Sequence, residues 1–253
     1  MDLSLILESI LFASQKPLSV RELRDLLGLS VAPIAIAFVD SVPANLARPK
    51  STMPSPTADG RTGAVPAGCV FWNKATESAF ATIAADHGNC SVGSYTHGFK
   101  TLAEAAQGAD VQALVGADWV SMEAAAKIPT VGKKPAAVLY GPLAAGAFDP
   151  DVVFLRLNGK QLMLVNDAWP ELRFEGKPQC HIIPIAQASG QVAVSSGCML
   201  SRVRTGMSHN EVTCALPAAK LADLVARLKR AQAADMKVAA YAADDAKRFA
   251  PVA

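Results

Sequence analysis

Apolar residues recur every three or four positions near both ends of the chain, which predicts amphipathic helices there. Residues 3–14 place leucine and isoleucine at this spacing, and residues 218–234 combine a leucine and valine stripe with outward lysine and arginine. Ser19 is followed three residues later by Glu22, a pattern typical of a capped helix start. We therefore expect residues 1–28 to form a short N-terminal helical arm.

The middle of the chain alternates between short apolar runs, which indicate strands, and short helical patterns. A proline-rich stretch with serine, threonine and glycine, residues 43–66, predicts a long loop that covers a pocket. The expected strands are residues 32–39, 136–140, 152–157, 181–185, 191–195 and 211–216; the expected helices are residues 69–84, 101–107, 110–115 and 121–127, and residues 159–168 fit either a helix or a strand and turn.

These elements follow one another without a regular strand–helix–strand repeat, which favours an α+β fold over a doubly wound sheet. We expect residues 29–253 to form a single domain in which helices flank a mixed or largely antiparallel sheet. The alternative is a subdivision near residues 130–135, because beyond them short apolar runs alternate with glycine and proline.

Composition narrows the class of protein. Apolar residues make up 51% and charged residues 18%, as in globular chains, and the formal net charge of +2 gives no basic field for nucleic acid. No apolar run is long enough to span a bilayer, and Asp2 and Glu8 interrupt the apolar start, which argues against a signal peptide. We expect a cytoplasmic protein whose five cysteines are thiols or metal ligands rather than disulfides.

Candidate chemistry is concentrated in residues 86–98, where His87, Cys90 and His97 fall within eleven positions. Imidazole and thiol groups ligate metals or act as bases and nucleophiles. Gly93 lies among them and lets the backbone approach a bound group closely. This stretch therefore predicts a binding or catalytic site, with His97, His87 and Cys90 as candidate catalytic residues.

Four cysteines, Cys69, Cys90, Cys180 and Cys198, lie at expected element ends, where side chains from distant parts of a sequence converge. Thiolates bind iron–sulfur clusters, zinc or copper(I). The absence of a C-x2-C pair argues against a ribbon-type zinc site, and the absence of C-x-x-C-H excludes covalent haem. A shared metal or cluster, haem held by His97 or a cysteine, and cysteines that serve only as small apolar residues all stay open.

Two further residues are candidates for contacting a ligand. Trp72 is able to wall a pocket, although tryptophan is more often a core residue, and Arg202 is able to pair with a carboxylate or phosphate, although such arginines often face solvent. Together these residues indicate a metal- or cofactor-dependent redox or lyase-type enzyme acting on a small molecule. The alternatives are a non-catalytic redox or metal sensor, and an enzyme with Cys90 as nucleophile beside His87 or His97.

The order and spacing of several short motifs resemble the family known as domain of unknown function 169. The resemblance runs from about residue 22 to residue 232, implies a cytoplasmic single domain of prokaryotic type, and draws attention to the four cysteines. The family resemblance implies no particular activity. The motifs that carry it are residues 33–38, Cys69, Asp86-His87 with Asn89-Cys90 and Gly93, Cys180, Ser196-Gly197-Cys198 with Arg202, and Leu216-Pro217.

The first 28 residues resemble the opening of the winged-helix family segregation and condensation protein B. That resemblance would imply a regulator that contacts DNA, but no basic recognition helix follows, so nucleic acid is not the expected partner. Residues 1–14 are instead expected to pack on a second subunit, giving a homo-oligomer.

Overall fold

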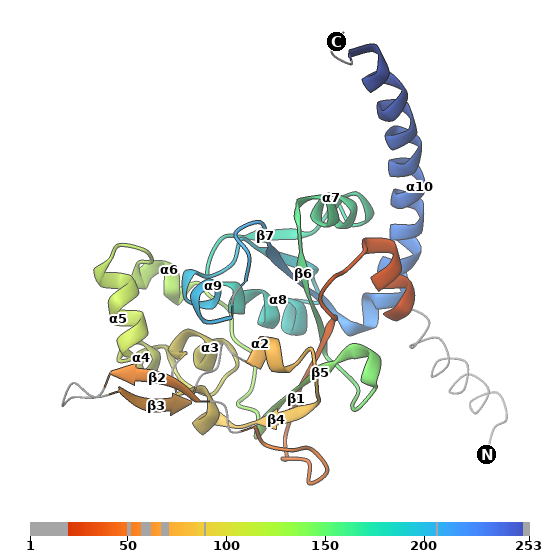
Figure 1. The fold of residues 1–253 in the computed structure, drawn as a ribbon. Helices are drawn as coiled ribbons and strands as arrows, with labels where there is room; N and C mark the ends of the chain where they lie inside the picture. The colour runs from red at the N-terminus through yellow and green to blue at the C-terminus, as the bar shows by residue number, and fades with distance from the viewer. Residues whose placement is uncertain are drawn as a thin grey trace, which may run out of the picture.

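The computed structural model describes residues 20–49, 52–56, 62–66, 71–88, 90–205 and 207–249. Within them, seven strands form one mixed sheet with helices on both faces, so the α+β prediction is confirmed (Figure 1). Neighbouring strands are antiparallel except for the last pair, which is parallel. In spatial order they are β4 (Phe80–Thr82), β5 (Ala137–Pro142), β1 (Ile34–Val39), β6 (Val152–Leu157), β9 (Val212–Pro217), β8 (Ala193–Ser195) and β7 (Arg173–Glu175).

Alternation along the strands divides the core into two layers. In β6, Val153 and Leu155 face one layer, whereas Val152 and Phe154 face the other, because successive side chains leave a strand on opposite sides. Residues 20–27, α7 (Gly159–Ala168) and the start of α10 (Leu221–Ala246) cover the first layer. Helices α2 (Phe71–Lys74) and α8 (Ile182–Ser189) cover the second, with α3 (Ser91–Thr96) and α9 (Met199–Thr205) beyond them.

Three short helices, α4 (Leu102–Ala106), α5 (Ala109–Gly116) and α6 (Met122–Ala126), form a group that contacts α3 (Figure 1). Thr101 and Glu104 form a capping box at the start of α4, and Ser121 caps α6. The remaining elements are the ribbon of β2 (Thr52–Pro56) and β3 (Thr62–Pro66) and the 3-10 turns η2 (Ala84–His87), η3 (Leu143–Ala145), η4 (Gln179–His181), η5 (Ala218–Lys220) and η6 (Lys247–Phe249).

Two expected elements are wrong. The helix expected over residues 69–84 is short where the structure describes it, because α2 ends at Lys74 and residues 80–82 pair with β5 instead. The strand expected over residues 181–185 is the start of α8, whose isoleucines are buried on all sides. A short apolar run fits a buried helix as well as a strand, so periodicity does not separate the two.

Two further segments differ from their expected form. The loop expected over residues 43–66 contains β2 and β3, and β7 was not expected at all. Residues 159–168, left open by the sequence, form α7, which begins with a capping box between Asn158 and Gln161.

Residues 20–27 pack into the domain core, with the side chain of Leu23 fully buried. The expected helix at residues 3–14 and its subunit contact lie outside the described residues and stay predictions. Among the residues that the structure does describe, no helix combines the length and apolar character needed to cross a bilayer.

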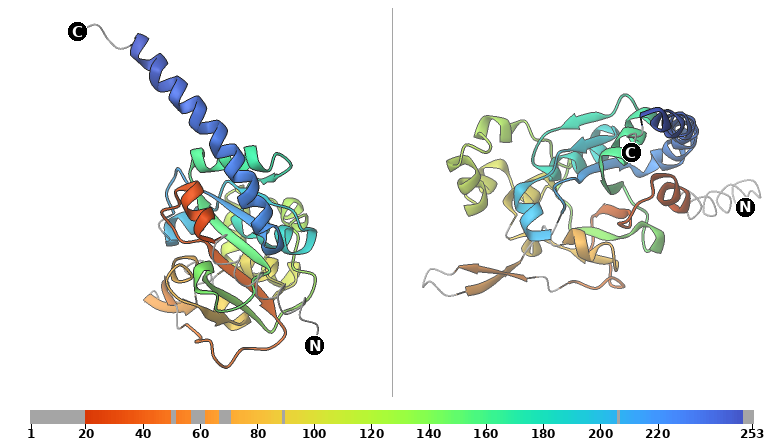
Figure 2. Two further views of the ribbon diagram at one scale, coloured as in Figure 1. Left: turned by 90° about the vertical axis from the view of Figure 1, so that its right-hand side faces the viewer. Right: turned by 45° about the horizontal axis from the view of Figure 1, so that its top comes forward.

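The C-terminal half of α10 extends away from the body of the protein, as Figure 1 and the left view of Figure 2 show. Leu221, Leu224, Val225 and Leu228 in its first two turns are buried, whereas Met236, Val238 and Tyr241 are exposed. Only the first part of the helix therefore contributes to the core.

We expect Leu224→Ala to lower the free energy of unfolding by about 2–5 kcal/mol, since it removes a fully buried side chain. Tyr241→Ala, on the exposed half of the same helix, should change it by less than about 0.5 kcal/mol. Urea titration followed by circular dichroism measures both. An equal loss in the two variants would show that the distal half packs against something.

Candidate functional site

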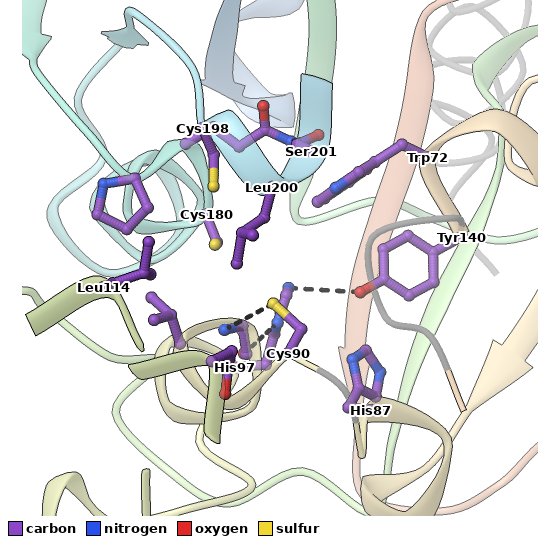
Figure 3. Close-up of a pocket in the computed structure, with 15 residues that line it drawn as sticks. Trp72, His87, Cys90, His97, Leu114, Tyr140, Cys180, Cys198, Leu200 and Ser201 are labelled. Atoms are coloured by element: carbon purple, nitrogen blue, oxygen red, sulfur yellow. Dashed lines mark hydrogen bonds between the residues drawn. The ribbon is translucent and has the colours of Figure 1, made fainter. Parts of the chain in front are cut away.

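A cavity lies between α3, η4 and α9, with β5 and α5 at its sides (Figure 3). Its volume of about 30 Å³ holds one or two water molecules or an ion. Cys90, Cys180, Cys198, His87 and His97 all line it, and Figure 3 shows the three sulfur atoms directed into the same space. The fold thus brings together side chains that are more than a hundred positions apart in the sequence.

Each of the three cysteines lies at the start of a short helical segment. Cys90 is the N-cap of α3, Cys180 is in η4, and Cys198 directly precedes α9. All three are buried. Helix starts direct unsatisfied N–H groups toward a capping side chain, and the Cys90 sulfur accepts one of them, from Gly93.

Gly93 fixes the position of the Cys90 sulfur. The N–H of Gly93 donates to Cys90 Sγ at 3.3 Å. A Cβ atom on residue 93 would lie 2.9 Å from that sulfur, which is closer than real Cβ contacts come. The glycine therefore allows the backbone to approach the Cys90 sulfur closely, and its predicted contact with a bound group stays a prediction.

His97 ends α3, and its protonation state follows from its partners. Nδ1 lies 2.6 Å from the carbonyl oxygen of Gly93, which only accepts, so Nδ1 carries the proton. The lone pair of Nε2 therefore faces the Tyr140 hydroxyl, 3.4 Å away (Figure 3). Burial lowers the pKa of His97 to about 4, so the ring is neutral at physiological pH.

His87, in η2, is held in a similar way. The Thr82 hydroxyl donates to the carbonyl of Val138, so the same oxygen accepts from His87 Nε2–H at 2.9 Å. Burial, with the neighbouring His97 as a smaller cause, lowers the pKa of His87 well below its usual value. The two ring centroids are 5.6 Å apart. A pair of neutral imidazoles provides bases or metal ligands rather than a positive charge.

Trp72 is both a core residue and a wall of the cavity. It stacks on Phe154 with ring centroids 4.5 Å apart and meets Tyr140 edge-on at 5.7 Å. The core and ligand-contact interpretations of Trp72 are therefore compatible, because one face packs while another part of the side chain lines the cavity.

Arg202 is not among the residues that line the cavity. Its guanidinium donates to the backbone carbonyls of Ser196, Ser208 and Glu211, which joins the two ends of the loop around α9. A role in recognising an anion has no support from this placement, since backbone acceptors already occupy the donors.

The two remaining cysteines of the chain are Cys214 and Cys69. Cys214 lies in β9 on the opposite face of the sheet, and burial raises the pKa of its thiol to about 12, so it is an apolar core residue. Cys69 lies outside the described residues, and its role as a ligand stays a prediction.

Sequence reasoning missed several lining residues, among them Tyr140, Gln179 and Ser201. Gln179 precedes Cys180, and Ser201 follows Cys198 by three positions, so helical spacing around the two cysteines was the available signal. For Tyr140 the sequence offers no such signal, because its position is that of any inward-facing residue of a strand.

No three His, Cys, Asp or Glu side chains in the described part of the chain are close enough to hold a single metal ion. Cys90, Cys180 and Cys198 nonetheless line one cavity, together with both histidines. A haem macrocycle would require the walls of the cavity to move apart, because about 30 Å³ is far below its size.

The model of the family DUF169, described as "Uncharacterised ArCR", matches residues 22–227 of the chain. Comparison with curated proteins and with solved structures gave no match.

Acid should destabilise the protein through its buried histidines. The unfolded chain binds a proton near pH 6.5 but folded His97 only near pH 4, so stability falls as the pH drops through this interval. The loss of unfolding free energy from His97 alone reaches about 3 kcal/mol below pH 4.

Urea-induced unfolding at several pH values measures this loss. His97→Asn should flatten the slope, while His209→Asn, at an exposed position, should leave it unchanged; equal slopes in all three proteins would contradict the assignment.

Proposed function

The chain belongs to the DUF169 family, whose description gives no activity, and we propose its function from the cavity: it binds an iron–sulfur cluster or a soft metal ion through buried cysteines. The observation that carries this proposal is the convergence of Cys90, Cys180 and Cys198 from three separate elements beside the neutral ring of His97. When bound, such a group would supply redox or Lewis-acid chemistry toward a small molecule.

The chemistry of the lining supports a soft metal. Thiolates and imidazole favour iron–sulfur clusters, zinc and copper(I) over magnesium or calcium. Metal binding to cysteine requires the thiolate, and a bound metal would stabilise it in these largely apolar surroundings. A cavity of about 30 Å³ has room for one ion, and a bulkier cluster would require its walls to move apart.

The protein's own groups support this role. His97 offers the unprotonated Nε2, and the Tyr140 hydroxyl beside it is placed to donate or accept a proton at that atom. Trp72 and Tyr140 exclude water from this side of the cavity. A reducing compartment would preserve the thiols as ligands, which favours a cytoplasmic location.

The small size of the cavity favours a second candidate, a metal or redox sensor without turnover. An enzyme with Cys90 as nucleophile has less support. A reactive cysteine usually has its pKa lowered by a nearby positive charge, and burial keeps both neighbouring histidines neutral.

Purified anaerobically, the full chain should contain iron with sulfide, or zinc or copper, by elemental analysis, with visible charge-transfer absorbance in the case of iron. Cys90→Ala, Cys180→Ala and Cys198→Ala should each lose most of the bound metal. Cys214→Ala is the matched control, because this buried cysteine lies on the opposite face of the sheet and should retain the full content. A colourless, metal-free protein that is folded by circular dichroism would overturn the proposal.

A further inference from the structure

We propose that the same cavity binds a small uncharged molecule that donates a hydrogen bond to the side-chain oxygen of Gln179. The observation behind this inference differs from that behind the metal proposal, and a metal held in the same cavity of about 30 Å³ would compete with the ligand. The inference rests on a buried amide with one open end and on a second, apolar cavity beside the first.

The amide of Gln179 is nearly inaccessible, at 2% exposure, and lines the cavity. Its Nε2 donates to Ser201 Oγ at 2.9 Å. Its Oε1 has no hydrogen-bond partner among the described residues. Buried polar groups in native proteins are nearly always bonded, so this oxygen indicates a donor that the described residues do not supply, and we infer that a ligand supplies it.

The direction of the hydrogen bonds fixes which end of the amide is open. The Thr205 hydroxyl donates to the backbone carbonyl of Ser201 at 2.7 Å, so Thr205 Oγ1 is left as the acceptor for the Ser201 hydroxyl at 3.4 Å. Ser201 Oγ therefore accepts from Gln179 Nε2, and the amide oxygen, an acceptor, is the end available to a ligand.

The lining favours an uncharged ligand. Asp110 is the one carboxylate among the described lining residues, and it already accepts from the backbone N–H of Ser91 at 2.9 Å. The other groups around the space are thiols, neutral rings, an amide, a hydroxyl and apolar side chains. A charged ligand would lose its hydration there without gaining a counter-charge.

A neighbouring cavity gives room for an apolar part of the ligand. It has a volume of about 20 Å³, lies beneath α4, α5 and α6, and shares Val92, Leu114 and Pro178 with the first cavity. Its lining is apolar apart from the hydroxyl of Tyr95, which donates to the carbonyl of Ile128. Leu114 is therefore part of the wall between the cavity that holds the Gln179 amide and a second, apolar cavity.

The closing experiment uses two isomers small enough for a cavity of this volume, ethanol, which donates a hydrogen bond, and dimethyl ether, which does not. After metal analysis and removal of any bound metal with a chelator, each is titrated against the full-length protein and against Leu114→Ala, in which the shared wall is smaller, with ligand-observed NMR as the readout. We expect saturable binding of the alcohol, at least about tenfold tighter than the ether, and tighter binding of both in Leu114→Ala.

Gln179→Met should abolish the preference for the alcohol. Gln187→Met is the matched control: Gln187 also has an unpartnered amide oxygen but lies outside both cavities, so this variant should keep the preference. Equal binding of the two isomers, or no saturable binding to either protein, would overturn the proposal and assign the amide oxygen to a buried water. Metal analysis of the same samples is a separate result, so either proposal can fail alone.

Discussion

The site depends on one backbone unit, the peptide groups of Gly93 in the short helix α3. Its N–H donates to the sulfur of Cys90, and its carbonyl accepts from His97 Nδ1 at 2.6 Å. The missing side chain leaves room for the sulfur. One residue therefore positions the thiol, fixes the tautomer of the imidazole and sets the distance between them. Any larger residue would have to displace the sulfur, and with it one wall of the cavity.

Burial then decides what these groups do. Both histidines are enclosed by aromatic side chains such as Phe71 and Tyr140, and enclosure makes the charged form of each ring costly. Neutral imidazoles do not stabilise a thiolate by charge, but they do offer lone pairs. The metal site that we propose would use these lone pairs.

The two faces of the sheet differ in what covers them. Among the described residues, the face under α7 and the first part of α10 carries a hydrophobic cluster that includes Cys214. The other face carries Tyr140 and is covered by α2 and α8, and the cavity between α3, η4 and α9 lies on this side. Cys214 therefore lies away from the cavity, which is why it serves as the control for the other cysteines.

The sequence by itself determined the fold class, most of the sheet strands and the long C-terminal helix, and it marked the stretch from His87 to His97 as a candidate site, because alternation, helical spacing and clustered side chains are local signals. It suggested that Cys180 and Cys198 would join Cys90 but could not decide this against a role as separate apolar residues, and it did not predict that residues 182–189 would be a helix. Gln179 and the structural role of Arg202 were also out of reach. These features depend on which segments of the chain pack together. Packing determines which side chains are buried, which histidine tautomer forms and which polar groups lack a partner. Local spacing in the sequence carries none of this information, so only the tertiary structure decided these features.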